Sequence, residues 1–139
     1  MFELHTRLAE DCIVIGDLPL CSLLMMNDAR YPWFLLVPRR ENIKEIYQLS
    51  AEDQYQLAKE SSALSQSLMT LFSGDKINMA ALGNIVNQLH VHHIVRYFTD
   101  EAWPSPIWGR GEAQHYTEAE LAHLVRLFQQ LLNELKAHL

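Results

Sequence analysis

The amino-acid sequence predicts an α+β fold in which an antiparallel sheet packs against a long central helix and a C-terminal helix. Short apolar runs follow one another with turn residues between them, as expected for antiparallel strands. Two longer segments repeat their leucines at helical spacing, one lying between strands and one after them. The elements do not alternate as βαβαβ, which disfavours a doubly wound parallel sheet.

The first third of the chain predicts one short helix followed by three strands. We expect the helix over residues 2–10. The apolar runs that follow predict strands over residues 12–16, 21–26 and 33–37. The third run is apolar on both faces and is stopped by Pro38, so it suits the middle of the sheet.

The central helix is expected over residues 50–72. Ser50 suits its N-cap and Gly74 follows its end. Its apolar side chains fall largely on one stripe, which consists of Leu57, Leu64, Leu68, Leu71 and Phe72. Two further strands are expected after it, over residues 76–82 and 86–98.

The C-terminal helix has a well-marked start. Thr117-Glu-Ala-Glu120 has the sequence of a capping box, in which each end residue bonds the backbone of the other. The apolar face that follows consists of Leu121, Leu124, Phe128, Leu131 and Leu135. An amphipathic helix of this kind buries one face against the rest of the fold.

Length and composition bound the domain organisation and the class of partner. The 139 residues are expected to form one domain, residues 1–139, large enough to fold without disulfides. Cys12 and Cys21 lie in apolar runs and are expected to be buried thiols. The net charge of −6 argues against binding to nucleic acid or to anionic membranes. No apolar run approaches the ~20 residues of a membrane span and the acidic N-terminus is unlike a signal peptide, so a cytoplasmic location is expected.

The segment 84–96 contains the polar residues most suggestive of chemistry. In a strand, successive side chains point to opposite faces. Gln88, His90 and His92 are therefore expected on one face, and His93 on the other. Two imidazoles at positions i and i+2 stand ~7 Å apart, within reach of one substrate atom or ion.

These histidines allow three interpretations. They are structural and hydrogen-bonded in the core, or they bind a metal, or they act on phosphorus. A zinc site needs three or four ligands, and the further candidates, such as Asp28 or His115, would have to converge by folding. Nucleophilic attack on phosphorus needs one neutral imidazole, a second polar group to hold its ring, and donors for the developing charge. The segment supplies all three types of group.

Two stretches of the chain carry a family resemblance. Gly83-Asn84-Ile-Val-Asn-Gln88-Leu-His90-Val-His92-His93-Ile-Val resembles the signature of the histidine triad (HIT) proteins, in which His-φ-His-φ-His-φ-φ, with φ apolar, ends a strand. Upstream, Asn27-Asp28-Ala-Arg-Tyr-Pro-Trp-Phe-Leu-Leu-Val-Pro38 looks like the loop and strand that carry the family's nucleoside-binding residue. Together the resemblance covers most of residues 12–98.

The resemblance implies a homodimeric nucleotidyl hydrolase or transferase that needs no metal or cofactor. Such enzymes attack the α-phosphate of a nucleotide derivative and pass through a nucleotidyl-histidine intermediate. By resemblance, His90 falls at the nucleophile and His92 at the histidine that contacts the phosphate. Gln88 falls at the first motif histidine, which orients the others. Asn84 and Asn27 fall where many members bind the phosphate and the ribose hydroxyls, respectively.

Gln88 is the main departure from the family pattern. It suggests a bacterial-type variant similar to diadenosine polyphosphate hydrolases. Its amide can hydrogen-bond a neighbouring ring but cannot carry a proton, so any acid–base role falls to His92 or to the substrate. His93 occupies a position that is usually hydrophobic, and we expect it to be structural.

Phosphate binding calls for positive charge near the histidines. Arg30 is the preferred candidate because its loop also carries Asn27. The other arginines near the expected site are Arg39, Arg40 and Arg96. Trp103 and Trp108 lie in a proline-containing segment and either cover a base, line a dimer contact or pin the last helix to the sheet.

The leading hypothesis is a nucleotidyl hydrolase that cleaves dinucleoside polyphosphates or nucleoside phosphoramidates. Two alternatives stay open. One is a nucleotide-binding protein of the same fold that has lost catalysis, with Gln88 marking the loss. The other is a metal-binding protein that uses the His-x-His pair.

Overall fold

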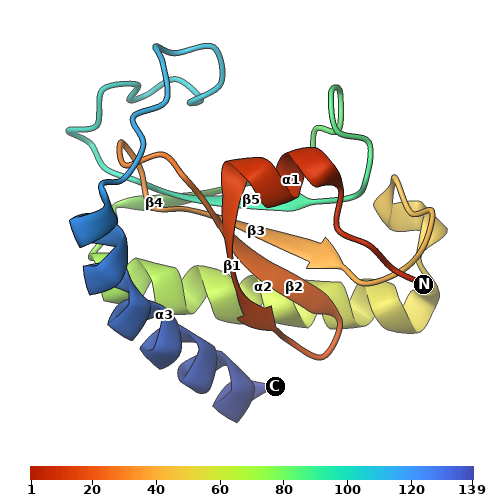
Figure 1. Cartoon of the computed structure of the whole chain (residues 1–139). Helices are drawn as coiled ribbons and strands as arrows, with labels where there is room; N and C mark the ends of the chain where they lie inside the picture. Colours follow the sequence, from red (N-terminus) through yellow and green to blue (C-terminus); the bar gives the residue numbers. More distant parts are fainter.

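One antiparallel sheet of five strands organises the chain. The computed structural model describes residues 1–139 (Figure 1). The strands are β1 (Cys12–Asp17), β2 (Cys21–Met26), β3 (Trp33–Pro38), β4 (Lys76–Ala80) and β5 (Val91–Arg96). The helices are α1 (Thr6–Asp11), α2 (Ala51–Phe72) and α3 (Glu118–His138), with a 3-10 turn, η1 (Ile46–Gln48), ahead of α2. The predicted α+β class, long central helix and C-terminal helix are confirmed.

The strands lie in the order β1-β2-β3-β5-β4, and every neighbouring pair is antiparallel. β3 is therefore central, as its apolar run predicts, and β4 forms one edge. Figure 1 shows α2 and α3 together on one face of the sheet and α1 against the other.

The pleat of the sheet divides its apolar side chains between these two faces. Leu23 and Met25 of β2 belong to the larger core, which includes the buried leucines of α2 and α3. Leu24, which lies between them, belongs to a smaller core with Leu8 of α1. This period-two division is the pattern expected of a strand that is covered on both faces. Cys12 and Cys21 are both buried and free, as predicted.

Two predicted boundaries are wrong, and the second one affects the site. The first helix begins at Thr6 rather than at residue 2, and the strand expected over 86–98 is limited to β5. The ladder between β3 and β5 ends at the pair Leu36–Val91, two residues before Pro38. The residues just before Val91 have no strand partner, and the N–H of Leu89 instead donates to the carbonyl of Ile43 at 2.9 Å.

Local sequence fixes the ends of the long helices. The Ser50 hydroxyl accepts from the Asp53 N–H at 3.1 Å, and Thr117 forms the predicted capping box at the start of α3. After α2, a Cβ at Gly74 would lie 2.4 Å from a methyl carbon of Val95. Glycine therefore allows the end of α2 to pass close to β5.

Candidate functional site

His90 and His92 lie together in a cleft on the α1 face of the sheet. Their ring centroids are 4.9 Å apart and their planes are inclined by 73°. The cleft has a volume of about 280 Å³, and Asn84 lines it together with both histidines. Arg7 and Asp11 of α1 and Trp108 of the long loop after β5 also line it. Three of the six predicted site residues are therefore gathered here.

The hydrogen bond at Nδ1 of His90 sets the state of its other ring nitrogen. Nδ1 lies 2.7 Å from the backbone carbonyl oxygen of Gln88. A carbonyl oxygen only accepts, so the Nδ1–H of His90 donates this bond. In the neutral imidazole, Nε2 then carries a free lone pair. This is the state that a nitrogen nucleophile needs.

His92 is held in the opposite state. The indole N–H of Trp33 donates to Nδ1 of His92 at 2.9 Å. An indole nitrogen only donates, so Nδ1 of His92 accepts and its ring proton is on Nε2. Burial, with smaller contributions from the charges of His90 and His93, lowers the pKa of His92 to about 3. His92 is therefore a neutral N–H donor at physiological pH.

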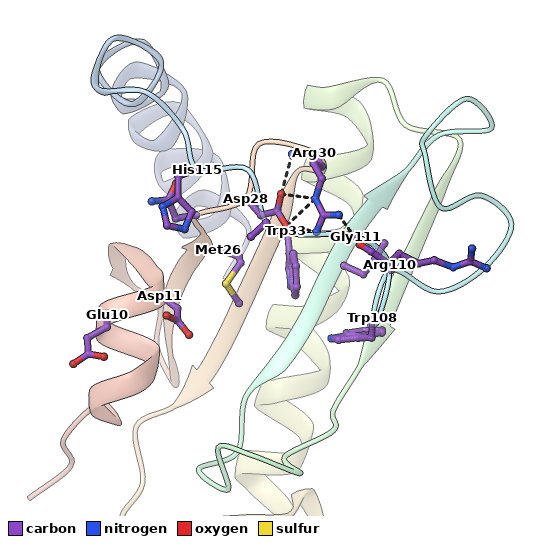
Figure 2. A pocket seen from close by; sticks show the side chains of 14 residues that line it. Glu10, Asp11, Met26, Asp28, Arg30, Trp33, Trp108, Arg110, Gly111 and His115 are labelled. Carbon is purple, nitrogen blue, oxygen red and sulfur yellow. Dashed lines mark hydrogen bonds and ion pairs between the residues drawn. The ribbon is translucent and has the colours of Figure 1, made fainter.

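A second cleft of about 310 Å³ adjoins the first and shares Asp11, Met26 and Trp108 with it. In Figure 2, Asp11 projects from α1 on one side, while Trp108 lies on the opposite side. Trp33 lies between them, and its ring centroid is 6.3 Å from that of Trp108 in an edge-to-face arrangement. The two clefts together form a compartment with two histidines beside a larger compartment with two indoles.

Comparison with known proteins identifies the family. The family model described as HIT domain matches residues 7–99, about two thirds of the chain. The chain belongs to the histidine triad (HIT) family. No curated protein matches the sequence.

Solved structures of other HIT proteins are similar over nearly the whole chain. A histidine triad protein from Marinobacter aquaeolei VT8 is 53% identical, with a TM-score of 0.94, over 97% of this chain and 98% of that one. One from Sinorhizobium meliloti 1021 is 43% identical, with a TM-score of 0.90, over 94% and 96%. One from Bradyrhizobium japonicum is 46% identical, with a TM-score of 0.89, over 93% and 96%.

The side chain of Gln88 in this HIT protein does not face the histidines as predicted. Its side-chain oxygen accepts from the N–H of His5 at 2.8 Å, and its amide nitrogen donates to the carbonyl of Glu3 at 2.8 Å. The expected contact of this amide with His90 is therefore absent, and the backbone carbonyl of Gln88 holds the ring instead. The reason is that Gln88 precedes β5, so the alternation of side chains in a strand does not apply to it.

Arg30 is also placed differently from the prediction. Its guanidinium donates to the buried carboxylate of Asp28 at 2.8 Å and to Glu101 at 3.1 Å. Hydrogen bonding to Asp28 raises the pKa of Arg30 above its ordinary value. Arg30 lines the second cleft but not the histidine cleft (Figure 2). Its charge is thus already neutralised by carboxylates of the protein.

Asn27 lines the second cleft, next to Arg30. Its side-chain oxygen accepts from the N–H of Tyr116 at 2.9 Å, which ties the loop after β2 to the segment before α3. The amide nitrogen of Asn27 makes no hydrogen bond within the protein. The structure therefore keeps Asn27 apart from the histidines but in the adjoining compartment.

The remaining predicted arginines are hydrogen-bonded within the protein. Arg96 is buried and forms two hydrogen bonds with Asp100, at 2.8 and 3.0 Å. Arg39 bonds the carbonyl of Pro19, and Arg40 pairs with Asp53. None of the three lines the histidine cleft.

Two residues of the site are not predicted from the sequence. Arg7 of α1 lines the histidine cleft, with its side chain 57% exposed and only a 3.7 Å ion pair to Asp11. It is the single cation in the lining of that cleft. Trp33, which bonds His92, is predicted only as part of a central apolar strand. The Arg–Asp spacing of i and i+4 was a visible helical signal, whereas nothing local indicates that Trp33 and His92 are diagonal neighbours across two strands.

His93 faces the other side of the sheet, as predicted. Its Nε2 lies 2.7 Å from the hydroxyl of Ser61 on α2. Burial lowers the pKa of His93 to about 4, so it is a neutral, internally bonded side chain. No group of three or more His, Cys, Asp or Glu side chains is placed to hold a metal ion, and neither Asp28 nor His115 lines the histidine cleft.

Proposed function

We propose that this HIT protein is a nucleotidyl hydrolase or transferase that cleaves a dinucleoside polyphosphate or a similar nucleotide derivative at its α-phosphate. The observation that carries the proposal is the pair of opposite Nε2 states in one cleft. His90 offers a lone pair and His92 offers an N–H donor. The centroids of the two rings are 4.9 Å apart. One can attack phosphorus while the other binds the charge that develops on its oxygens.

The reaction proceeds in two displacements. The lone pair on Nε2 of His90 attacks the α-phosphorus, and the bond to the leaving group breaks with its electron pair going to the leaving oxygen. The proton of His90 stays on Nδ1 and is donated in a hydrogen bond to the Gln88 carbonyl, which stabilises the positive charge of the nucleotidylated ring. Water then attacks phosphorus and loses a proton to solvent. The P–N bond to His90 breaks, and its electron pair returns to Nε2.

The residues around the two clefts fit the two halves of a nucleotide. The Nε2–H of His92, the amide of Asn84 and the guanidinium of Arg7 bind phosphate oxygens in the histidine cleft. The nucleoside lies in the adjoining cleft, where Asn27 donates to a ribose hydroxyl and Trp108 packs against the base. Because the chain carries a net charge of −6, this local arrangement rather than overall charge attracts the phosphates.

Trapping the covalent intermediate tests the proposal. Wild-type protein is mixed with diadenosine tetraphosphate, quenched in alkali within the first turnover, and digested for peptide mass spectrometry. We expect an adenylyl group on the peptide that contains His90. His90→Asn should carry no adduct and lose several orders of magnitude in turnover, whereas the matched control His93→Asn should still form it. A wild-type protein that turns over substrate without any adduct would contradict the proposal.

A second candidate is a nucleotide-binding protein without catalysis. The observation that favours it is the Gln88 amide, which is engaged by Glu3 and His5 and so leaves no side chain to relay a proton to His90. Calorimetric binding of AMP combined with no burst and no turnover on a panel of nucleotide anhydrides would establish it.

We also propose that the protein acts as a homodimer in the cytoplasm. β4 is an exposed edge strand, and Met79 on it is 60% exposed. Met79 also lines a groove of about 250 Å³, together with side chains from η1, α2 and β5. No helix has the length and apolar character required to cross a bilayer. Sedimentation of wild type and Met79→Lys tests the dimer: a dimer that Met79→Lys dissociates supports it, and a wild-type monomer at high concentration refutes it.

A further inference from the structure

Trp33 holds His92 in a way that bears on which substrates the site can cleave. Trp33 is the first residue of β3 and pairs with Ile94 of β5, so it is a diagonal neighbour of His92 on the same face of the sheet. Its Nε1 lies 2.9 Å from Nδ1 of His92, and the two ring centroids are 5.7 Å apart. Trp108 contacts the edge of His92 from the opposite loop, at 5.3 Å between centroids.

An indole is an unusual partner for a catalytic histidine because it has no acceptor. A carboxylate or carbonyl opposite Nδ1 would favour a protonated ring. The indole N–H instead opposes protonation of Nδ1, since two N–H groups would then face each other. The charged groups that line the same cleft are Arg7 and Asp11 of α1, which pair with each other, and the remaining titratable neighbours are His90 and His93. None of these supplies an acceptor to Nδ1 of His92.

A His92 that stays neutral can donate a hydrogen bond but cannot deliver a proton to a leaving group. Giving up the Nε2 proton would leave an imidazolate, which is far too basic to form here. The other histidine is unavailable as an acid, because the Nε2 of His90 becomes bonded to phosphorus in the first step. The leaving group must therefore depart without proton transfer from either imidazole.

We infer that Trp33 is a positioning residue that restricts this site to leaving groups which depart as anions, so that phosphoric anhydrides of nucleotides are substrates and nucleoside phosphoramidates are not. In an anhydride, the P–O bond breaks and its electron pair stays on a phosphate oxygen that is stable as an anion. In a phosphoramidate, the P–N bond breaks to give an amine, whose nitrogen must gain a proton as it leaves. This inference rests on the proposed nucleotidyl transfer and names the substrate class for it.

The experiment compares one anhydride with one phosphoramidate in wild type and in Trp33→Gln. The substrates are diadenosine tetraphosphate and adenosine 5′-phosphoramidate, and the readout is the ratio of their kcat/KM values. General acid catalysis is worth ~10²–10⁴-fold, so we expect wild type to favour the anhydride by at least ~100-fold. The Gln side-chain oxygen can accept from Nδ1–H, so Trp33→Gln should narrow that ratio by ~10-fold or more. Intrinsic differences in substrate reactivity cancel when the ratio in Trp33→Gln is compared with the ratio in wild type.

A second readout follows the ring of His92 directly. Imidazole ¹⁵N shifts, assigned by the loss of one set of signals in His92→Asn, should show wild-type His92 neutral and protonated on Nε2 down to pH ~4. Trp33→Phe and Trp33→Gln should let His92 titrate at higher pH. Trp103→Phe is the matched control, because this indole packs against Phe98 and Arg96 rather than against His92.

The outcomes separate this inference from the proposed function. Comparable turnover of both substrates by wild type, or a substrate ratio that Trp33→Gln leaves unchanged while His92 becomes protonated, overturns the role of Trp33 and leaves nucleotidyl transfer standing. A wild-type His92 that carries its proton on Nδ1 also overturns it. No turnover of either substrate and no His90 adduct refutes the proposed function and the substrate inference together.

Discussion

Asp100 is predicted to hold the loop that carries Trp108 over the site, and its replacement tests the electrostatics of the fold. Its carboxylate accepts two hydrogen bonds from the buried guanidinium of Arg96, at 2.8 and 3.0 Å. It also accepts from the N–H groups of Tyr97, Ala102 and Trp103 at 3.1, 3.1 and 2.8 Å. One carboxylate therefore organises the first turn of the loop after β5.

The pKa of Asp100 sets the size of the effect. Burial alone would raise this pKa, but the hydrogen bonds from Arg96 and from the backbone lower it to about 2, against an ordinary 3.8. A difference of 3.8 − 2, about 1.8, corresponds to about 2 kcal/mol of folding free energy. Asp100→Asn should cost at least that much, and up to ~3–5 kcal/mol, because it leaves the buried Arg96 without its counter-ion.

The pH dependence has a definite sign. Since the folded-state pKa is the lower one, this stabilisation is complete above pH ~4 and is lost as the pH falls through about 2. Urea denaturation of wild type and Asp100→Asn at pH ~7 and pH ~3 measures the gap, which should shrink by about 1 kcal/mol at the lower pH. Glu101→Gln is the matched control, because this neighbour is 58% exposed and its ion pair with Arg30 should be worth less than ~1 kcal/mol. Equal stabilities of wild type and Asp100→Asn at pH ~7, or a gap that does not change with pH, would show that the Asp100 carboxylate does not stabilise the loop.

Three further substitutions test the core, the phosphate site and the nucleoside site. Glu60→Gln should lower the free energy of unfolding, measured by calorimetry, by ~2–3 kcal/mol. The reason is that the buried carboxylate accepts from the N–H groups of Leu20 and Cys21 at 2.8 and 2.9 Å. An unchanged melting temperature would contradict this prediction. Arg7→Ala should raise KM with little change in kcat and should weaken the salt dependence of kcat/KM. Steady-state assays at two ionic strengths measure both effects. An unaltered KM would show that Arg7 does not bind phosphate. Asn27→Ala should weaken AMP binding, measured by calorimetry, by ~10-fold, because one buried hydrogen bond is lost. An unchanged affinity would mean that the ribose does not bind at Asn27.

The sequence predicts most of the fold because local patterns and burial agree. The capping box at Thr117 and the apolar run of β3 each identify an element without knowledge of its neighbours. The strand expected over 86–98 fails because the length of β5 is set by its partners, and the ladder with β3 ends at Val91. A single strand cannot reveal where its neighbour stops.

The candidate site is predictable in part for the same reason. His90 and His92 are close in sequence, so any extended backbone keeps them near each other. Trp33 and Arg7 come from elements that only the complete topology brings to the cleft. Gln88 occupies the expected motif position, yet its amide binds Glu3 and His5, which lie more than eighty residues away in sequence.

The stereochemical course at phosphorus distinguishes a nucleotidyl-histidine intermediate from direct attack by water. A substrate made chiral at its α-phosphorus with sulfur and oxygen isotopes is hydrolysed by wild-type protein, and the configuration of the nucleotide product is read by ³¹P NMR. Two displacements through His90 predict overall retention of configuration. Inversion would mean that water attacks phosphorus in one step, and it would contradict a nucleotidyl-histidine intermediate.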